Sequence, residues 1–231
     1  MADDPRKRTV QAGYDAMAEH YLAWGGEIEG DPRHRFLHEF ARRLPDGARV
    51  LDLGCGGGIP STKQLAERFE VVGADISEAQ LRLARANVPN ATLIHGDFAE
   101  LHFVDEAFDG ITAFYSISHV PRNEHDALFR RIAKWLTPGG FFLASLGAGG
   151  SPDWTGDWLG VPMFFSSHDA RHEPTPTQRR GTHARHRRGS LDEGTRGRGR
   201  VPVGACAEAR AVAASTLKFC TRPFAGTSRL T

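Results

Sequence analysis

Residues 50–58 read VLDLGCGGG, and they carry the clearest structural signal in the sequence. It begins as a short apolar run, which is typical of a buried strand, and ends in glycines that permit a tight turn. Helix-like sequence follows to about Arg68. A strand that turns through glycines into a helix predicts the first unit of a parallel, doubly wound α/β sheet.

Strands and helices alternate on both sides of this turn. Apolar strands are predicted over residues 71–74, 91–94, 108–115 and 141–146, and amphipathic helices over 8–24, 33–44 and around 128–136. Ser77 and Gln80 have the spacing of a capping box, which predicts a helix start after the second strand. This alternation predicts βαβ units with right-handed crossovers, and therefore a Rossmann-like sheet.

Charge and composition divide the chain of 231 residues, although its net charge is only +1. Residues 1–170 carry 16 Lys and Arg against 24 Asp and Glu, whereas residues 171–231 carry 13 against 4. Only 8 of the last 61 residues are large and apolar, too few to form a core. We therefore divide the chain into N-terminal helices (1–47), a sheet core (48–147), a loop or lid that starts a helix (148–170), and an Arg/Gly-rich tail (171–231) expected to be disordered.

The three cysteines lack the spacing of a disulfide framework or a zinc site. No run of 18 apolar residues predicts a membrane span, and residues 1–10 lack the apolar part of a signal peptide. The sequence thus predicts a reduced, cytoplasmic protein without a metal. It does not indicate an oligomeric state.

Acidic side chains follow the predicted strands, where doubly wound sheets bind their ligands. Asp52 precedes the glycines, so it would repel a pyrophosphate and attract an ammonium group. Asp75 ends the second strand and can accept hydrogen bonds from the two hydroxyls of a ribose. After the third strand, Asp97 can accept from the exocyclic amine of adenine, and Phe98 can pack on its ring. These positions favour an adenosine ligand with a cationic end.

Five segments together resemble the class I S-adenosylmethionine-dependent methyltransferases, in their order and spacing, over about residues 10–170. They are VLDLGCGGG (50–58), VVGADIS (71–77), IHGDFAEL (94–101), FDGITAFYSISHV (108–120) and WLTPGGFFLASL (135–146). The resemblance implies a seven-stranded sheet whose last pair of strands includes an antiparallel member. It also implies S-adenosylmethionine as cofactor, and transfer of its methyl group by in-line displacement to a small-molecule acceptor.

The same resemblance implies which residues bind the cofactor. Tyr14 and Tyr21 belong to a Y-D-x-M-A-x-x-Y pattern, which matches an N-terminal helix that closes over the methionine end. Asp52 would lie near the methionine ammonium, usually through water. The expected cofactor-binding residues are Tyr14, Tyr21, Asp52, Gly54, Gly56, Gly58, Asp75, Ile76, Asp97, Phe98 and Phe114.

His119 follows the fourth strand and is the candidate general base. A base is needed only if the attacking atom carries a proton of high pKa. The sequence lacks the N-P-P-Y or D-P-P-Y motif of many enzymes that methylate DNA or protein glutamine, which disfavours those substrates. An NAD-linked oxidoreductase is an alternative, disfavoured by Asp52 and by Ile59 at the third glycine position of the dinucleotide fingerprint. A protein that binds RNA through its basic tail is another.

The tail is rich in Arg, Gly, Ala and Pro, the residues of GC-rich codons. Dropping one base from the codons allowed from His172 onward permits a helix, a strand, an acidic turn and a closing strand. We therefore predict a frameshifted or aberrant C-terminus from about residue 171, with the final strands missing or replaced. The edge of the fifth strand would then be exposed and the activity weak or absent. An in-frame gene without an insertion or deletion near Ala170 would contradict this prediction.

Overall fold

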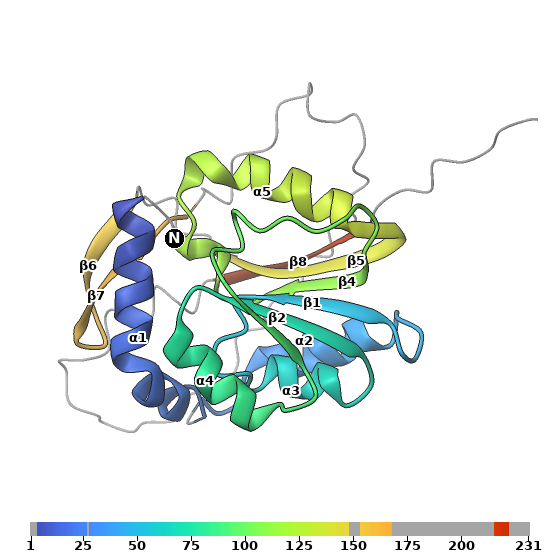
Figure 1. Ribbon diagram of the computed structural model, residues 1–231, viewed down its shortest axis with the longest axis horizontal. Helices are drawn as coiled ribbons and strands as arrows, with labels where there is room; N and C mark the ends of the chain where they lie inside the picture. The colour runs from blue at the N-terminus through green and yellow to red at the C-terminus, as the bar shows by residue number, and fades with distance from the viewer. Residues whose placement is uncertain (1–3, 27, 148–152, 168–214, 222–231) are drawn as a thin grey trace, which may run out of the picture.

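The computed structural model describes residues 4–26, 28–147, 153–167 and 215–221. Its centre is a six-stranded sheet with the order β3-β2-β1-β4-β5-β8 (Figure 1). Its members are β1 (Arg49–Leu53), β2 (Glu70–Asp75), β3 (Thr92–His95), β4 (Phe108–Ala113), β5 (Leu136–Gly147) and β8 (Ser215–Thr221). All neighbours pair in parallel except β5 and β8. The predicted doubly wound, Rossmann-like sheet is confirmed.

Helices cover both faces of this sheet. The helices on the faces are α2 (Pro32–Ala41), α3 (Ser61–Ala66), α4 (Glu78–Asn87) and α5 (Arg122–Trp135). Helix α1 (Pro5–Gly26) lies at one end of the sheet, and a short 3-10 turn, η1, spans Ile117–His119. In Figure 1, α2, α3 and α4 lie below the sheet and α5 lies above it. As the capping box predicts, α4 begins after Ser77, whose Oγ accepts the Gln80 N–H at 3.1 Å. No helix within the described ranges is long and apolar enough to cross a membrane.

The two faces of the sheet bury separate apolar clusters. Val50 and Leu51 are consecutive in β1 and both fully buried, because strand side chains alternate between faces and both faces are covered. Leu51 belongs to the cluster under α5, and Val50 to the cluster under α2 and α3. Such continuous apolar strands hold the strand ends in fixed positions, and those ends form the site.

Residues 154–165 form a β-hairpin, where the sequence predicted an aperiodic loop or lid. Strand β6 (Trp154–Trp158) pairs antiparallel with β7 (Val161–Phe165). Leu159 and Gly160, with φ of 53° and 83°, form the two-residue turn. Positive φ at both positions is typical of the tight turn that suits hairpins.

The hairpin and α1 lie side by side at one end of the sheet (Figure 1). Val10 and Met17 of α1 are buried against Met163 and Phe164 of β7. A Cβ on Gly13 would lie 2.9 Å from the Pro162 carbonyl oxygen, so only glycine permits this approach. We call α1 and the β6–β7 hairpin the cap.

The expectation of an exposed β5 edge is wrong. Strand β8 pairs antiparallel with β5, in a register that runs from Phe141 opposite Thr221 to Gly147 opposite Ser215. It therefore occupies the place where the resemblance implies an antiparallel strand. The helix expected after Ser166, and the tail at 168–214 and 222–231, lie outside the described residues. The frameshifted C-terminus stays a prediction.

Candidate functional site

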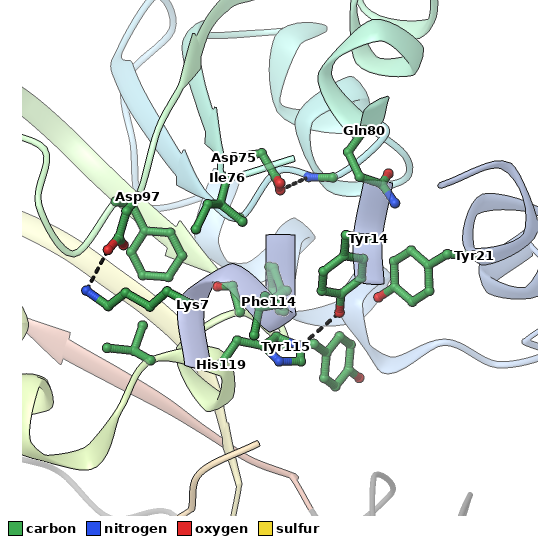
Figure 2. A pocket seen from close by; sticks show the side chains of 16 residues that line it. Lys7, Tyr14, Tyr21, Asp75, Ile76, Gln80, Asp97, Phe114, Tyr115 and His119 are labelled. Carbon is green, nitrogen blue, oxygen red and sulfur yellow. Dashed lines mark hydrogen bonds and ion pairs between the residues drawn. The ribbon is translucent and has the colours of Figure 1, made fainter. Parts of the chain in front are cut away.

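A cavity lies at the carboxyl ends of β1, β2 and β4, and α1 closes it (Figure 2). This edge is the topological switch point: the chain runs from β1 outward to β2 and β3 and then returns to β4 on the other side of β1. Doubly wound sheets bind ligands at such a point. Ten of the twelve predicted site residues line it: Tyr14, Tyr21, Gly54, Gly56, Asp75, Ile76, Asp97, Phe98, Phe114 and His119. The sequence motifs thus converge on one cavity.

The turn after β1 can be built only from glycine at its key position. Gly54 has a φ of +74°, and a Cβ there would collide with the Cβ of Ser116. The N–H of Gly56 points to Asp75 and donates to its Oδ2 at 2.8 Å. Gly58 lies outside the cavity wall, and a Cβ there would approach Val88 Cγ2 to 2.9 Å. Gly58 therefore packs against the end of α4, and its predicted cofactor contact stays a prediction.

Asp75 is a buried carboxylate in the cavity wall. Besides Gly56, the Ser77 N–H donates to it, to Oδ1 at 2.9 Å. Burial raises the pKa of Asp75 to about 6, although the two N–H groups oppose this shift. Each oxygen keeps acceptor capacity, so Asp75 can still receive hydrogen bonds from a pair of hydroxyls.

Asp52 lies behind the glycine turn, away from the cavity. Its side chain is 1% exposed, and the hydroxyls of Thr62 and Thr112 donate to its two oxygens at 2.7 and 2.8 Å. Burial raises the pKa of Asp52 against these hydrogen bonds. In this structure Asp52 thus joins β1 to α3 and β4, and its contact with a ligand ammonium stays a prediction.

Lys7 of α1 binds Asp97, and sequence reasoning missed it. Its Nζ lies 2.6 Å from Asp97 Oδ2, 2.5 Å from Glu124 Oε2 and 3.6 Å from Glu100 Oε1. Burial lowers the pKa of Lys7, but its bonds to Asp97 and Glu124 outweigh that effect and raise it. Asp97 therefore binds the cap through Lys7, and any adenine amine must share this carboxylate. No local sequence pattern indicates a contact between Lys7 and Asp97, which lie 90 residues apart in the chain.

Gln80 is a second site residue that sequence reasoning missed, because the sequence indicated it only as part of a capping box. Its side chain is fully buried in the cavity wall, and among the described residues neither its amide oxygen nor its amide nitrogen has a hydrogen-bond partner. A buried amide without partners costs free energy unless a ligand satisfies it. Gln80 is thus the clearest mark of a polar ligand in this cavity.

His119 joins the cap to the sheet wall. Its Nδ1 lies 2.8 Å from the carbonyl oxygen of Phe164, and its Nε2 lies 2.8 Å from Tyr14 Oη (Figure 2). Burial lowers the pKa of His119 to about 4, so the ring is neutral near pH 7. With both nitrogens engaged, His119 does not present a free base to the cavity.

The side chains that line the cavity fit an adenosine-containing ligand with polar ends. Ile76, Phe98 and Phe114 provide apolar surface, and Asp75 and Gln80 provide hydrogen-bonding groups. In the ranges that the structure describes, His, Cys, Asp and Glu form no group of three suited to a metal ion.

Comparison with known proteins shows that the sheet region is similar to methyltransferases. A family model described as a methyltransferase domain matches residues 50–140. The chain is 44% identical over 115 residues to trans-aconitate 2-methyltransferase of Variovorax paradoxus (strain S110), covering 48% of this chain and 43% of that protein. The chain spans about half the length of the curated relatives it matches.

Two solved structures share the fold. The structure titled "DhpI-SAH complex structure" aligns with a TM-score of 0.58 at 17% identity, over 71% of this chain and 81% of that one. The [4+2]-cyclase SpnF aligns with a TM-score of 0.53 at 25% identity, over 69% and 68%. The second title shows that this fold also serves reactions other than methyl transfer.

Proposed function

We propose that the chain, whose residues 50–140 match a methyltransferase domain, is a class I S-adenosylmethionine-dependent methyltransferase that methylates a small molecule. The main support is the cavity at the switch point. There, buried Asp75 and the Gln80 amide, which has no partner among the described residues, can hydrogen-bond to a polar ligand. The relative named for trans-aconitate supports a small-molecule acceptor.

We assign the cofactor-binding roles to side chains of the cavity wall. Asp75 would hold the ribose hydroxyls, and Ile76, Phe98 and Phe114 would pack against the adenosine. Tyr14 and Tyr21 would close the opposite side. Gln80 joins this set because a bound ligand would satisfy its amide.

The chemistry asks mainly for orientation and exclusion of water. Bound S-adenosylmethionine supplies an activated methyl group, so the attacking atom needs alignment more than it needs acid–base help. The cap excludes water by burying Val10 and Phe164 beside the cavity. This division of labour agrees with a site in which His119 is not a free base.

Calorimetry with S-adenosylhomocysteine tests the binding half of the proposal. We expect wild type to bind, and Asp75→Asn to bind at least about tenfold more weakly because a charged acceptor is lost. Asp46→Asn is the matched control, since Asp46 is exposed and distant in the fold. A folded wild type that binds NAD but not S-adenosylhomocysteine would overturn the proposal in favour of the oxidoreductase.

Transfer of a labelled methyl group tests the other half. A panel of small carboxylic acids that includes trans-aconitate is the first choice, because of the relative's name. A chain that binds the cofactor but never transfers its methyl group would contradict the enzymatic part. We also propose that the protein is cytoplasmic, and that an aberrant C-terminus makes its activity weak. Loss of RNA binding on removing residues 171–231 would instead favour the nucleic-acid alternative.

A further inference from the structure

His119, in the sheet wall, contacts both elements of the cap. It ends the short turn after β4 and is 8% exposed. One ring nitrogen meets the backbone of β7, at Phe164, and the other meets Tyr14 of α1. In Figure 2 the dashed line joins Tyr14 to His119 across the cavity.

The positions of the protons follow from these two contacts. A carbonyl oxygen can only accept, so Nδ1 must carry the proton that it donates to Phe164. A neutral imidazole has one N–H, and Nε2 is therefore an acceptor. The hydroxyl of Tyr14 must then donate to His119, because no other proton is available between them.

This direction fixes what Tyr14 offers to a ligand. Its only proton is used by His119, so Oη can only accept, and a ligand must share its lone pairs with the Tyr21 hydroxyl, which also hydrogen-bonds to Tyr14. The ring is held in place by an edge-on contact with Tyr21, at 5.2 Å between centroids, and by Trp158 at 6.3 Å. Tyr14 can accept hydrogen bonds or attract a positive centre, and it cannot donate to an anion.

We propose that His119 is a positioning residue which, anchored on the Phe164 carbonyl, turns the Tyr14 oxygen toward the positively charged sulfur centre of S-adenosylmethionine. This inference rests on the proposed function. A sulfonium has no N–H, so oxygen lone pairs and aromatic faces are the groups that can stabilise it. Tyr14 supplies the first and neighbouring Tyr21 the second. The hairpin thereby controls the cofactor site through one hydrogen bond.

Nitrogen NMR of the histidine rings tests the proton positions without any ligand. At pH 7, His119 should show a protonated Nδ1 and an unprotonated Nε2, the less common neutral tautomer. Exposed His20 of α1 serves as the control, and its ring should exchange between the two neutral tautomers. A protonated Nε2 at His119 would overturn the inference, because Tyr14 would then accept from the ring instead of donating to it.

Calorimetry on a double-mutant cycle tests the link between the two residues. Tyr14→Phe should weaken S-adenosylmethionine about tenfold, and S-adenosylhomocysteine, whose sulfur is neutral, clearly less. His119→Asn keeps a donor for Phe164 but no longer reaches Tyr14, so it should match Tyr14→Phe. His119→Gln places an amide oxygen near the former Nε2 and should retain most of the affinity. The double variant should be no weaker than Tyr14→Phe alone.

Additive losses in the cycle, or equal losses for both ligands, would overturn the inference. Thermal unfolding of each variant establishes that it is folded. Binding of both ligands by wild type separates this test from the proposed function: if wild type binds neither, the proposed function fails. If wild type binds and the cycle is additive, only the role of His119 fails.

Discussion

The sheet wall and the cap close the same cavity with different chemistry. The sheet wall depends on backbone geometry, in which Gly54 adopts a positive φ and N–H groups of Gly56 and Ser77 hold Asp75. The cap depends on side chains that reach across from α1, above all Lys7 and Tyr14. Backbone geometry tolerates few residue types, whereas side-chain contacts can be replaced one at a time. Substitutions in the two walls should therefore differ in size.

The largest effect is expected for Gly54→Ala in the sheet wall. The positive φ and the collision with Ser116 together should lower the free energy of unfolding by about 4 kcal/mol. Gly139→Ala is the matched control, since Gly139 also has a positive φ, of +85°, but nothing within 4 Å of its Cβ position. It should cost about 1 kcal/mol. Urea unfolding measures both, and equal losses would show that the close approach to Ser116 is unimportant.

A smaller loss is expected for Lys7→Met in the cap. It leaves the buried carboxylate of Asp97 without its cation, while Glu124 is about a quarter exposed and can be hydrated. We expect a loss of about 2 kcal/mol in the free energy of unfolding, below the range for fully buried pairs. Arg85→Met breaks an exposed pair with Glu78 and should leave the free energy of unfolding nearly unchanged. Similar losses in the two variants would mean that Lys7 does not hold the cap.

The smallest effect in wild type is expected for pH, because two groups oppose each other. The pKa of Asp75 is raised from 3.8 to about 6 on folding, so its contribution to stability is lost as pH rises through that interval. The pKa of His119 is lowered from 6.5 to about 4, so its contribution is lost as pH falls through that interval. Between about pH 4 and 6 the two slopes should largely cancel.

Removing either group should expose the other slope. Asp75→Asn should become more stable as pH rises from about 4 to 6, and His119→Asn should become less stable over the same interval. Urea midpoints collected at several pH values give the comparison. If both variants kept the flat profile of wild type, neither group would titrate in this range in the folded protein.

The sheet wall could be predicted from sequence because its signals are local. The glycines after β1, the acid at the end of β2 and the capping box at Ser77 all lie within a few residues of the element they define. Period and turn chemistry carry such information. The parallel, doubly wound class of the sheet followed from the same local signals, whereas the order of its strands became known only from the structure.

The cap could not be predicted in the same way. Lys7 is one lysine in an ordinary helix, and only tertiary folding brings it to Asp97. Outside the cap, in β1, the hydroxyls of Thr62 and Thr112 donate to the oxygens of Asp52, and no pattern in the sequence indicates these partners. The hairpin has a local signal in Leu159 and Gly160, but leucine is an uncommon residue at a positive φ. Pairing of β8 with β5 uses backbone groups, which leave no mark in the sequence.

The close approach at Gly13 has a consequence for how ligands enter and leave. Since the helix backbone rests on the Pro162 carbonyl, α1 cannot slide or roll along β7 without separating from it. Helix and hairpin should thus move as one rigid flap, and its opening breaks the contacts of Lys7 with carboxylates and of Asp15 with Ser77. Ions in solution compete for the lysine contacts. The rates of ligand binding and release should accordingly rise with ionic strength, because ion pairs hold the flap closed.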